Sequence, residues 1–532
     1  MLARMSEASG SGRDSKSSLA LLLAAAMFVF VIDTSLMNVS ISAVVRDLDT
    51  TVSGVQSAIA IEALVSAAFI LIGSKIGDLF GRKRAYMFGL LLYVSGALAM
   101  VFAQSLAPIL VFWAVVGGLG ASLYMPAMQS LIHGNFEGTG RAKAYALVGA
   151  SAAIAAAIGP LLGGFLTTYL SWRVGFMLEA VVIAIVLLGS RRLLLDVPYT
   201  GERSVDAVGS VLSVLGMGGL VLGVLAWQEG GESVGLLLGA GLAAMAGLFY
   251  WLNRRKREGK PALLDPQLFR LKLFSFGIAQ GILQQIALGG MLIALPIYLQ
   301  MVLEYDAMQA GLTLAPLSLT MFAAALIAGK RAGRRRPSAI VRAGFGLLLV
   351  GVAALIPLIP STDSGWSLVV PLMLAGCGLG LLVSQLNNYT LAPISEERVG
   401  EAAGVNSATG SFGLSLGLAF AGAIMLAALS IAFTEKAESS KVLTPPQQQQ
   451  VADTLEDDAQ LMSNVQLEEL LADKPPAARE EIVSINTDAR PLALQIALLV
   501  PLLSALIGLI LSFRMMRLPD PAPTTGAEPA SL

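Results

Sequence analysis

Long apolar runs separated by short polar segments dominate the pattern of this chain. An α-helix needs about 20 mostly apolar residues to cross a bilayer, and fourteen runs meet that requirement. The predicted spans are residues 19–44, 54–76, 85–103, 106–131, 144–169, 174–193, 205–227, 233–252, 274–300, 309–329, 340–359, 367–393, 402–433 and 490–513. The pattern predicts an all-α integral membrane protein whose two chain ends lie on one side.

The distribution of positive charge predicts the orientation. With these spans, 28 of the 35 Lys and Arg residues fall in segments on the N-terminal side. Because cytoplasmic loops are enriched in Lys and Arg, we expect both termini in the cytoplasm. The first run is too long for a signal peptide and shows no cleavage pattern, so we expect it to be retained. The sequence thus predicts a multi-pass protein of the cell membrane.

Composition narrows the class of protein further. Hydrophobic residues make up 55% of the 532 residues and charged residues 13%, against about 25% charged in a typical soluble domain. This excludes a soluble enzyme, a nucleic-acid-binding protein and a disordered scaffold. One cysteine, Cys377, and one histidine, His133, exclude an internal disulfide and a Cys- or His-rich metal site. We expect no cofactor, no metal and no enzyme site.

One segment between spans is acidic and long. Residues 434–489 hold twelve acidic and four basic side chains. Thr444, Ser463 and the Pro475-Pro476 pair each begin a pattern typical of a helix start. The segment predicts a small helical domain outside the membrane that could dock an envelope partner, and a disordered linker is the alternative. Residues 514–532 predict a cytoplasmic tail.

A glycine- and charge-rich loop, GSKIGDLFGRKR, follows the second span at Gly73 to Arg84. It resembles the signature loop of the major facilitator superfamily, with matching residues Gly77, Asp78, Gly81, Arg82 and Lys83. Glycine permits tight turns and close helix approach. The resemblance implies that Asp78 and Arg82 belong to a gate, and an ordinary positively charged turn is the alternative.

A second motif, GPLLGG, lies in the fifth span. Gly159, Pro160, Gly163 and Gly164 resemble the motif of exporters in that superfamily, and small residues also serve close helix packing. With fourteen spans, the chain resembles the drug:proton antiporter family. That resemblance implies six-helix bundles at 19–193 and at 261–433 with 490–513. It also implies a cytoplasmic tail at 1–18 and two inserted helices within 194–260.

Acidic residues inside the spans are candidates for proton coupling. Asp33 opens the phrase DTSLMNV, which resembles a phrase of that family. A buried aspartate in a membrane span is a functional hypothesis by default. Glu62 lies at similar depth in the second span, so the two carboxyls are predicted to share a cavity. Glu179 in the sixth span ranks below Glu62, and a purely structural Asp33 is the alternative.

The fourth span departs from the family pattern. The family usually carries an arginine there, but the corresponding residue is Ala114, beside Trp113. Proton coupling must therefore work without that arginine or be altered. His133 titrates in the right range, although an inert interfacial histidine is the more frequent case.

Polar and aromatic residues on several spans predict a substrate cavity, and helix-to-helix hydrogen bonding is the alternative for the amides. The predicted binding residues are Asp33, Glu62, Trp113, Tyr124, Met128, Gln129, Gln280, Gln284, Gln385, Asn387 and Asn388. An apolar cavity with sparse polarity suits amphiphiles. The resemblance implies an exporter of small hydrophobic or cationic amphiphiles, with protons and membrane lipid as partners. A lipid or envelope-precursor translocator and a non-transporting scaffold remain alternatives.

Overall fold

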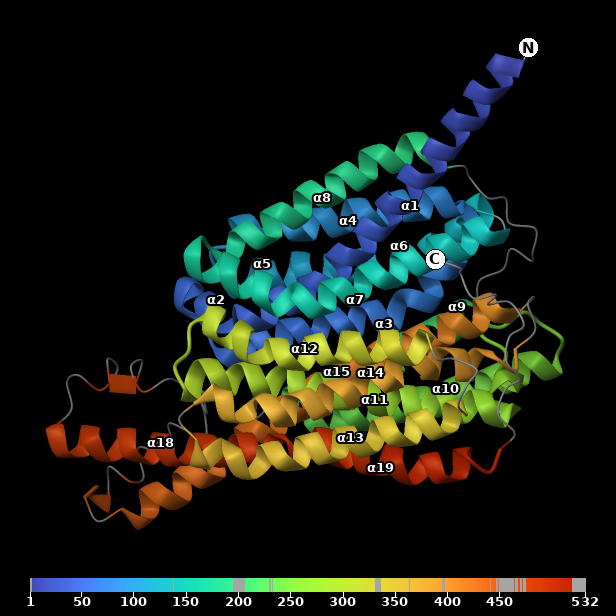
Figure 1. Cartoon of the computed structure of the whole chain (residues 1–532). Helices are drawn as coiled ribbons and strands as arrows, with labels where there is room; N and C mark the ends of the chain where they lie inside the picture. Colours follow the sequence, from blue (N-terminus) through green and yellow to red (C-terminus); the bar gives the residue numbers. More distant parts are fainter. Residues whose placement is uncertain are drawn as a thin grey trace.

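The computed structural model describes most of the chain as helices, and no strand occurs in the described part. The described residues are 2–136, 138–194, 206–228, 231, 233–330, 336–362, 364–394, 398–440, 442–445, 448, 464, 467–468, 471 and 475–518. Within them, fourteen helices are long and apolar enough to cross a membrane. The predicted fold class and number of spans are therefore confirmed (Figure 1).

The helices follow one another with short connections. Those of the first six spans are α1 (Leu2–Val39), α2 (Ile41–Leu48), α3 (Val52–Phe80), α4 (Arg82–Phe102), α5 (Leu106–Pro108), η1 (Ile109–Gly117), α6 (Gly118–Asn135), α7 (Gly138–Tyr169) and α8 (Trp172–Leu193). The two inserted spans are α9 (Ala207–Gln228) and α10 (Val234–Arg257). The remainder comprises η2 (Pro266–Arg270), α11 (Lys272–Ile297), η3 (Tyr298–Val302), α12 (Ala307–Lys330), α13 (Pro337–Leu358), η4 (Ile359–Ser361), η5 (Gly365–Leu368), α14 (Val369–Leu391), α15 (Val399–Ser439), α18 (Pro476–Ala497) and α19 (Leu499–Met515).

Helix pairing shows that the two halves repeat the same arrangement. In the first half, α1 packs against α7, α3 against α6, and α4 against α8. In the second half, the corresponding pairs are α11 with α15, α12 with α14, and α13 with α19. Each position in the first six spans thus has an equivalent in the last six, as in a parallel repeat.

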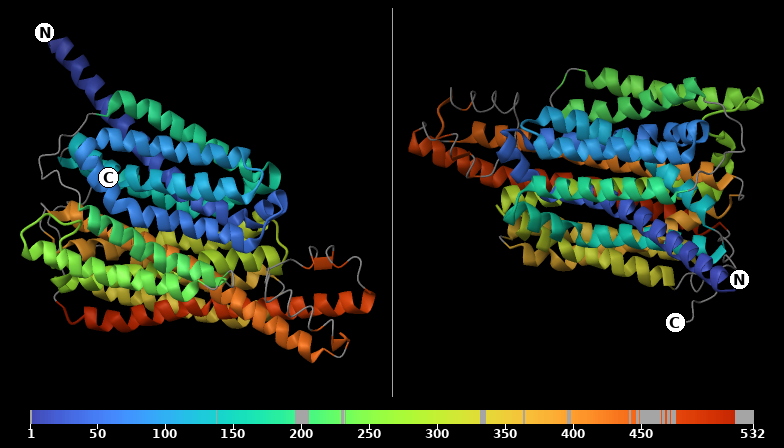
Figure 2. Two further views of the ribbon diagram at one scale, coloured as in Figure 1. Left: turned by 180° about the vertical axis from the view of Figure 1, so that it is seen from behind. Right: turned by 90° about the horizontal axis from the view of Figure 1, so that it is seen from above.

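Two seams join the halves. One is formed by α3 and α15 and the other by α7 and α12, which the repeat makes equivalent. The inserted helix α9 packs on both α3 and α15, and α10 packs on α9. Figure 2 shows this inserted pair, in green, on the outside of the bundle.

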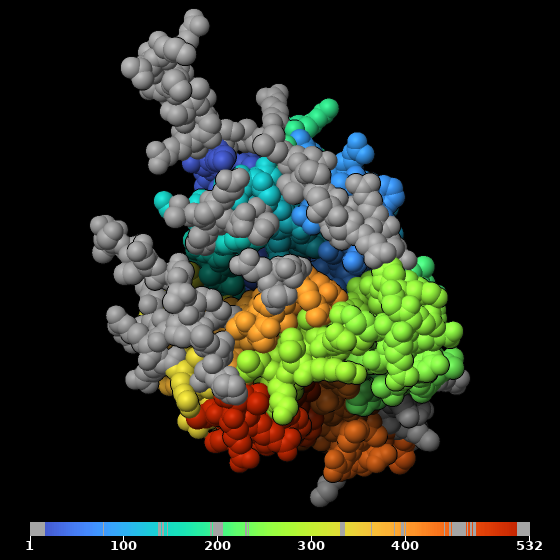
Figure 3. Space-filling model, turned by 90° about the vertical axis from the view of Figure 1, so that its right-hand side faces the viewer, coloured from blue at the N-terminus to red at the C-terminus, as the bar shows by residue number. Residues whose placement is uncertain are grey.

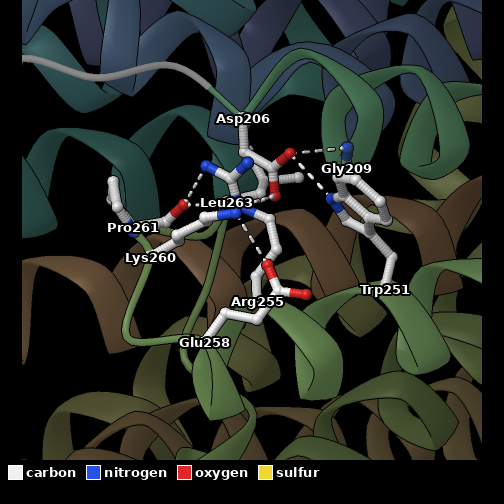
Figure 4. A network of polar contacts seen from close by, with 8 residues as sticks. All are labelled: Asp206, Gly209, Trp251, Arg255, Glu258, Lys260, Pro261 and Leu263. Carbon is white, nitrogen blue, oxygen red and sulfur yellow. Dashed lines mark hydrogen bonds and ion pairs between the residues drawn. The ribbon is translucent and has the colours of Figure 1, made fainter.

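A polar network holds the inserted pair in place (Figure 4). The buried carboxylate of Asp206 accepts hydrogen bonds from Gly209 N at 3.0 Å, Trp251 Nε1 at 2.9 Å and Leu263 N at 3.2 Å. Arg255 lies 4.0 Å from the same carboxylate and donates to the carbonyl of Pro261. The start of α9, the end of α10 and the following loop therefore share one buried anion.

A second cluster continues from this loop to α15. Asp265 pairs with Lys256 at 2.8 Å and with Arg398 at 2.9 Å, and its N–H donates to Glu401. Partial burial opposes ionisation of Asp265. The hydrogen bonds from Lys256 and from Gln267 N, with the charge of Arg398, outweigh it and lower the pKa of Asp265. Its pairing therefore persists at neutral pH and is lost only under acidic conditions.

Two helices extend further than their apolar runs. α15 reaches Ser439 and α18 begins at Pro476, as the proline pair predicts. Lys436 on α15 pairs with Asp488 on α18 at 3.0 Å, and Ile482 of α18 is buried beside them. This hairpin protrudes from the bundle (Figure 1). Most of the acidic segment between the two helices lies outside the described residues.

Candidate functional site

A cavity of about 280 Å³ lies between the two halves. We call the end of the bundle where α4 begins and α14 finishes the near end, and the opposite end, where α1 finishes at Val39, the far end. Six spans line the cavity, three from each half, with residues Phe30, Ser66, Ile70, Ala121, Met125, Gly281, Gln284, Gln285, Val383, Leu386, Asn387, Asn406, Ser407, Thr409, Gly410 and Ser411. None of these lining residues is charged.

Amides and hydroxyls make one wall of the cavity and apolar side chains another. Asn406 Nδ2 donates to Asn387 Oδ1 at 2.6 Å, and Gln284 donates to Gln285 at 3.3 Å. Both pairs stand on helices of the second half. Asn387 and Asn406 stand near the finish of α14 and the beginning of α15, so the cavity lies toward the near end. Figure 3 views the molecule from this end, with the first half in blue to teal and the second in orange to red.

The structure places two of the predicted amides, Gln284 and Asn387, on the cavity wall. Gln280 is instead buried and donates to the carbonyl of Gly508 on α19 at 3.2 Å. Gln385 is buried and donates to Ser384 at 3.3 Å. These two amides bond within the second half, as in the helix-bonding alternative. The side chain of Asn388 lies outside the described part.

The predicted residues of the fourth span lie away from the cavity. Met128 and Tyr124 are buried in the first half, whereas Gln129 is exposed. Met125, which lies between them in sequence, is the residue of this turn that reaches the cavity. The sequence pattern had no means of choosing among these neighbours, because the choice depends on how α6 is rotated against α3 and α4.

Asp33 is buried inside the first half. Tyr93 Oη donates to its Oδ2 at 2.7 Å, and Trp113 Nε1 donates to Oδ1 at 3.0 Å and to Oδ2 at 3.2 Å. The residue is 3% exposed and does not line the cavity. Asp33 and Trp113 are thus brought together, while the cavity that Asp33 was predicted to share lies elsewhere in this conformation.

An aromatic cluster separates Asp33 from the cavity. Tyr124 makes edge-to-face contacts with Phe30, Tyr86 and Tyr93, at centroid distances of 6.2, 6.3 and 5.6 Å. Phe30 lines the cavity on one side, and Tyr93 bonds Asp33 on the other. The rings therefore form a continuous path from the cavity wall to the carboxylate.

Two further acids lie near Asp33. Glu62 is 8% exposed and stands one helical turn before Ser66, which lines the cavity. Glu179 on α8 is 4% exposed. Both carboxyls interact electrostatically with Asp33. No ion pair to a basic side chain reaches any of the three within the described residues, and Ala114 is fully buried nearby.

The halves meet closely at the far end. Gln300 on η3 accepts from the N–H of Ser42 at 3.1 Å and donates to the carbonyl of Asn38 at 3.3 Å. The N–H of Met308 on α12 donates to Thr168 on α7 at 2.9 Å. Gln300 is buried. Sequence reasoning missed it, although a lone glutamine at the end of an apolar span was a usable signal.

The exporter-like glycines lie at this closure. Gly159 and Gly163 pack against Ser35 and Leu36 of α1, leaving no space for a Cβ. Gly164 faces α12 across the seam, where a Cβ would lie 2.9 Å from the Cα of Met308. Pro160 meets Gly311 of α12 in the same way. The motif therefore brings α7 close to both α1 and the other half.

The signature-like loop makes contacts within the first half. Gly81 has φ 103°, a conformation that side chains rarely adopt, and joins α3 to α4. Gly77 supplies the carbonyl that accepts the N–H of Gly81 at 3.1 Å. Lys83 donates to the carbonyls of Arg191 and Leu194 at 3.1 and 2.6 Å. Arg82 begins α4, and the side chains of Asp78 and His133 lie outside the described part.

Comparison with known proteins gives one family. The profile described as Major Facilitator Superfamily matches residues 23–418. The multidrug resistance protein Stp of Mycobacterium tuberculosis is 28% identical over 82% of this chain and 81% of its own length. The puromycin resistance protein pur8 of Streptomyces alboniger is 30% identical over 75% of this chain and 79% of its own.

Solved structures show the same fold. A bacterial homolog of the human lysosomal transporter Spinster, in an inward-facing and unoccupied conformation, superposes with a TM-score of 0.62 at 13% identity. It covers 94% of this chain and 98% of its own. A D-xylose–proton symporter gives a TM-score of 0.55 at 12% identity, covering 76% of this chain and 90% of its own.

Proposed function

The chain belongs to the Major Facilitator Superfamily, and from that premise we propose that it exports small amphiphilic compounds across the cell membrane in exchange for protons. Relatives named for drug resistance, such as Stp and pur8, support export rather than uptake. Alternating access by rocking of the two halves is the transport mechanism we propose, as is general for such repeats.

One observation carries the proposal. The cavity between the halves lies toward the near end, while Gln300, Met308 and Thr168 join the halves at the far end. This is one of the two arrangements that alternating access requires. The opposite arrangement needs the hydrogen bonds of Gln300 to Ser42 and Asn38 to break.

Orientation is part of the proposal. The near end is the cytoplasmic end in this assignment, because 28 of the 35 Lys and Arg residues lie on that side. The cavity then receives its substrate from the cytoplasm or the inner leaflet, as export requires.

The cavity wall supports the substrate class. Phe30, Ile70 and Met125 offer apolar surface from the first half, and the amides of Gln285 and Asn387 offer donors and acceptors from the second. An amphiphile with an apolar body and hydrogen-bonding groups meets both walls. A positively charged group would be directed toward Glu62, the carboxyl next to Ser66 on the cavity wall.

Proton exchange rests on the buried acids. Asp33, Glu62 and Glu179 form a group without an ion-paired basic side chain among the described residues, and three uncompensated charges at this depth are costly. Protons that neutralise this group in one conformation and leave it in the other would couple the proton gradient to rocking.

The test uses purified full-length protein in proteoliposomes with an imposed pH gradient. We expect a neutral or cationic amphiphilic dye to accumulate only with the gradient, and Asp33→Asn to abolish this accumulation. Asp49→Asn is the matched control, because Asp49 is exposed and left-handed, a conformation that asparagine accepts. Dye movement unaffected by Asp33→Asn, or movement of labelled phospholipid without proton flux, contradicts the proposal.

A further inference from the structure

We propose that Glu179 and Asp33 form one enclosed proton-binding site, in which Glu179 carries the proton and donates it toward the Asp33 carboxylate. The inference deepens the proton exchange proposed above and rests on it. It assigns a role to a residue of the sixth span that the sequence ranks below Glu62.

The crossing of α1 and α8 places the two carboxyls at the same level. These helices run antiparallel, with Gly175 opposite Leu36 and Gly189 opposite Leu22, in contacts so close that no Cβ fits on either glycine. Three residues back along α1 from Leu36 is Asp33, and four residues on from Gly175 is Glu179. The register of the two contacts therefore pairs Asp33 with Glu179.

The ring contacts support the same placement. Trp113, which donates to Asp33, lies edge to face with Phe176 at 6.3 Å. Phe176 is fully buried and stands three residues before Glu179 on α8. The side of α8 that carries Glu179 thus faces the residues that surround Asp33.

The hydrogen bonds of the two carboxyls are unequal. Both Asp33 oxygens accept from neutral donors, Tyr93 and Trp113. Both Glu179 oxygens are buried, and no hydrogen bond to another described residue reaches them. A carboxylate needs donors, whereas a protonated carboxyl supplies its own. The Asp33 carboxyl is therefore suited to the charged form, and Glu179 to the neutral form with Asp33 as its acceptor.

The surroundings leave the proton few other places. The titratable groups that face the pair are Glu62 from α3, Tyr93 and Tyr86 from α4, and Tyr124 from α6. None of them is basic. Two carboxylates side by side in such a site repel strongly, and one proton removes that repulsion.

The site is separate from the cavity yet connected to it. Phe30 touches the cavity and lies on α1 three residues before Asp33. A substrate that displaces Phe30 or Tyr124 moves the rings that hold Tyr93 against Asp33. Substrate entry can thus change the hydrogen bonds of the pair, and so proton retention, without occupying the pair itself.

Infrared spectroscopy of the purified full-length protein tests the assignment directly. We expect a carbonyl stretching component of a buried protonated carboxyl in the wild-type protein at neutral pH. Glu179→Gln removes this component. Asp33→Asn retains it at a shifted frequency, because Glu179 stays protonated beside a different acceptor. Asp49→Asn leaves it unchanged.

The outcomes separate this inference from the proposed function. A component that survives in Glu179→Gln, or that Asp33→Asn does not move, overturns the pair even when pH-driven transport is normal. The expected spectra without pH-driven transport by the wild-type protein uphold the pair and overturn the proton exchange. If Glu179→Gln fails to fold, Glu179→Asp keeps a carboxyl and is expected to keep the component, and its loss overturns the inference.

Discussion

At the scale of single residues, Asp33 is stabilised by donors that carry no charge. Tyr93 and Trp113 supply its hydrogen bonds, and no arginine or lysine among the described residues pairs with it. Neutral donors hold a carboxylate without fixing it permanently in the charged state, as a cation would. This suits a residue whose neighbourhood must exchange a proton.

Removing one of these donors should be measurable. Tyr93→Phe leaves Asp33 Oδ2 with only the longer bond from Trp113, and a hydrogen bond to a charged group contributes about 1.5–3 kcal/mol. We expect a loss of stability of that order and slower pH-driven transport. Thermal unfolding in detergent measures the first effect and dye accumulation the second.

Tyr169→Phe is the control for this change, since Tyr169 on α7 is 64% exposed. A Tyr93→Phe protein as stable and active as the control would show that Asp33 does not depend on this bond.

At the scale of elements, the inserted pair depends on the carboxylate of Asp206. Asp206→Ala leaves Trp251 Nε1 and the N–H groups of Gly209 and Leu263 without their acceptor (Figure 4). Each unsatisfied buried donor costs about 1–3 kcal/mol. We expect a lower melting temperature and faster proteolysis in the loop between Glu258 and Asp265.

Glu258→Gln is the companion control for the Asp206 variant. Glu258 pairs with Arg254 and Lys260 in an exposed position, and such pairs contribute little to stability. Equal effects of the two substitutions would mean that Asp206 does not hold α9 and α10 in place.

Hydropathy predicted the elements well and their ends less well. Most span ends agree within a few residues because the bilayer sets the length of an apolar run. The first span finishes at Val39 rather than residue 44, because Ser40 bonds back to Leu36 and across to Thr167 where the chain turns into α2. The extensions of α15 and α18 are polar and depend on packing against each other, which a hydropathy pattern does not detect.

The candidate site was predictable only in part. Asp33 and Glu62 stand out because charge is rare in spans, and the pairing of Asp33 with Glu179 does not, since it depends on the register of two helices more than 140 residues apart in sequence. The choice of Met125 over Met128 for the cavity depends likewise on helix rotation. Local patterns identify unusual residues, and only the packed structure shows their neighbours.

At the scale of the whole molecule, closure of the far end depends on the close approach of α7 and α12. Gly164→Leu places a large side chain where even a Cβ would collide with the backbone at Met308. We expect this variant to favour separation of the halves at the far end. Spin labels at Asp49→Cys and Glu304→Cys, with Cys377→Ser, should report a longer distance between them.

Gly149→Leu on the same helix is the control, because nothing lies within 4 Å of a Cβ at that position. Unchanged label distances in the Gly164 variant would show that this contact does not set the balance between the two conformations.

The position of the inserted helices makes the two seams unequal toward the surrounding bilayer. α9 covers the line where α3 meets α15, and neither inserted helix packs on α7 or α12. Acyl chains can therefore wedge between the halves only on the flank that carries Gly164 and Gly311. Changes in bilayer thickness or lateral pressure act on this transporter from one flank, as on a door hinged along its other edge.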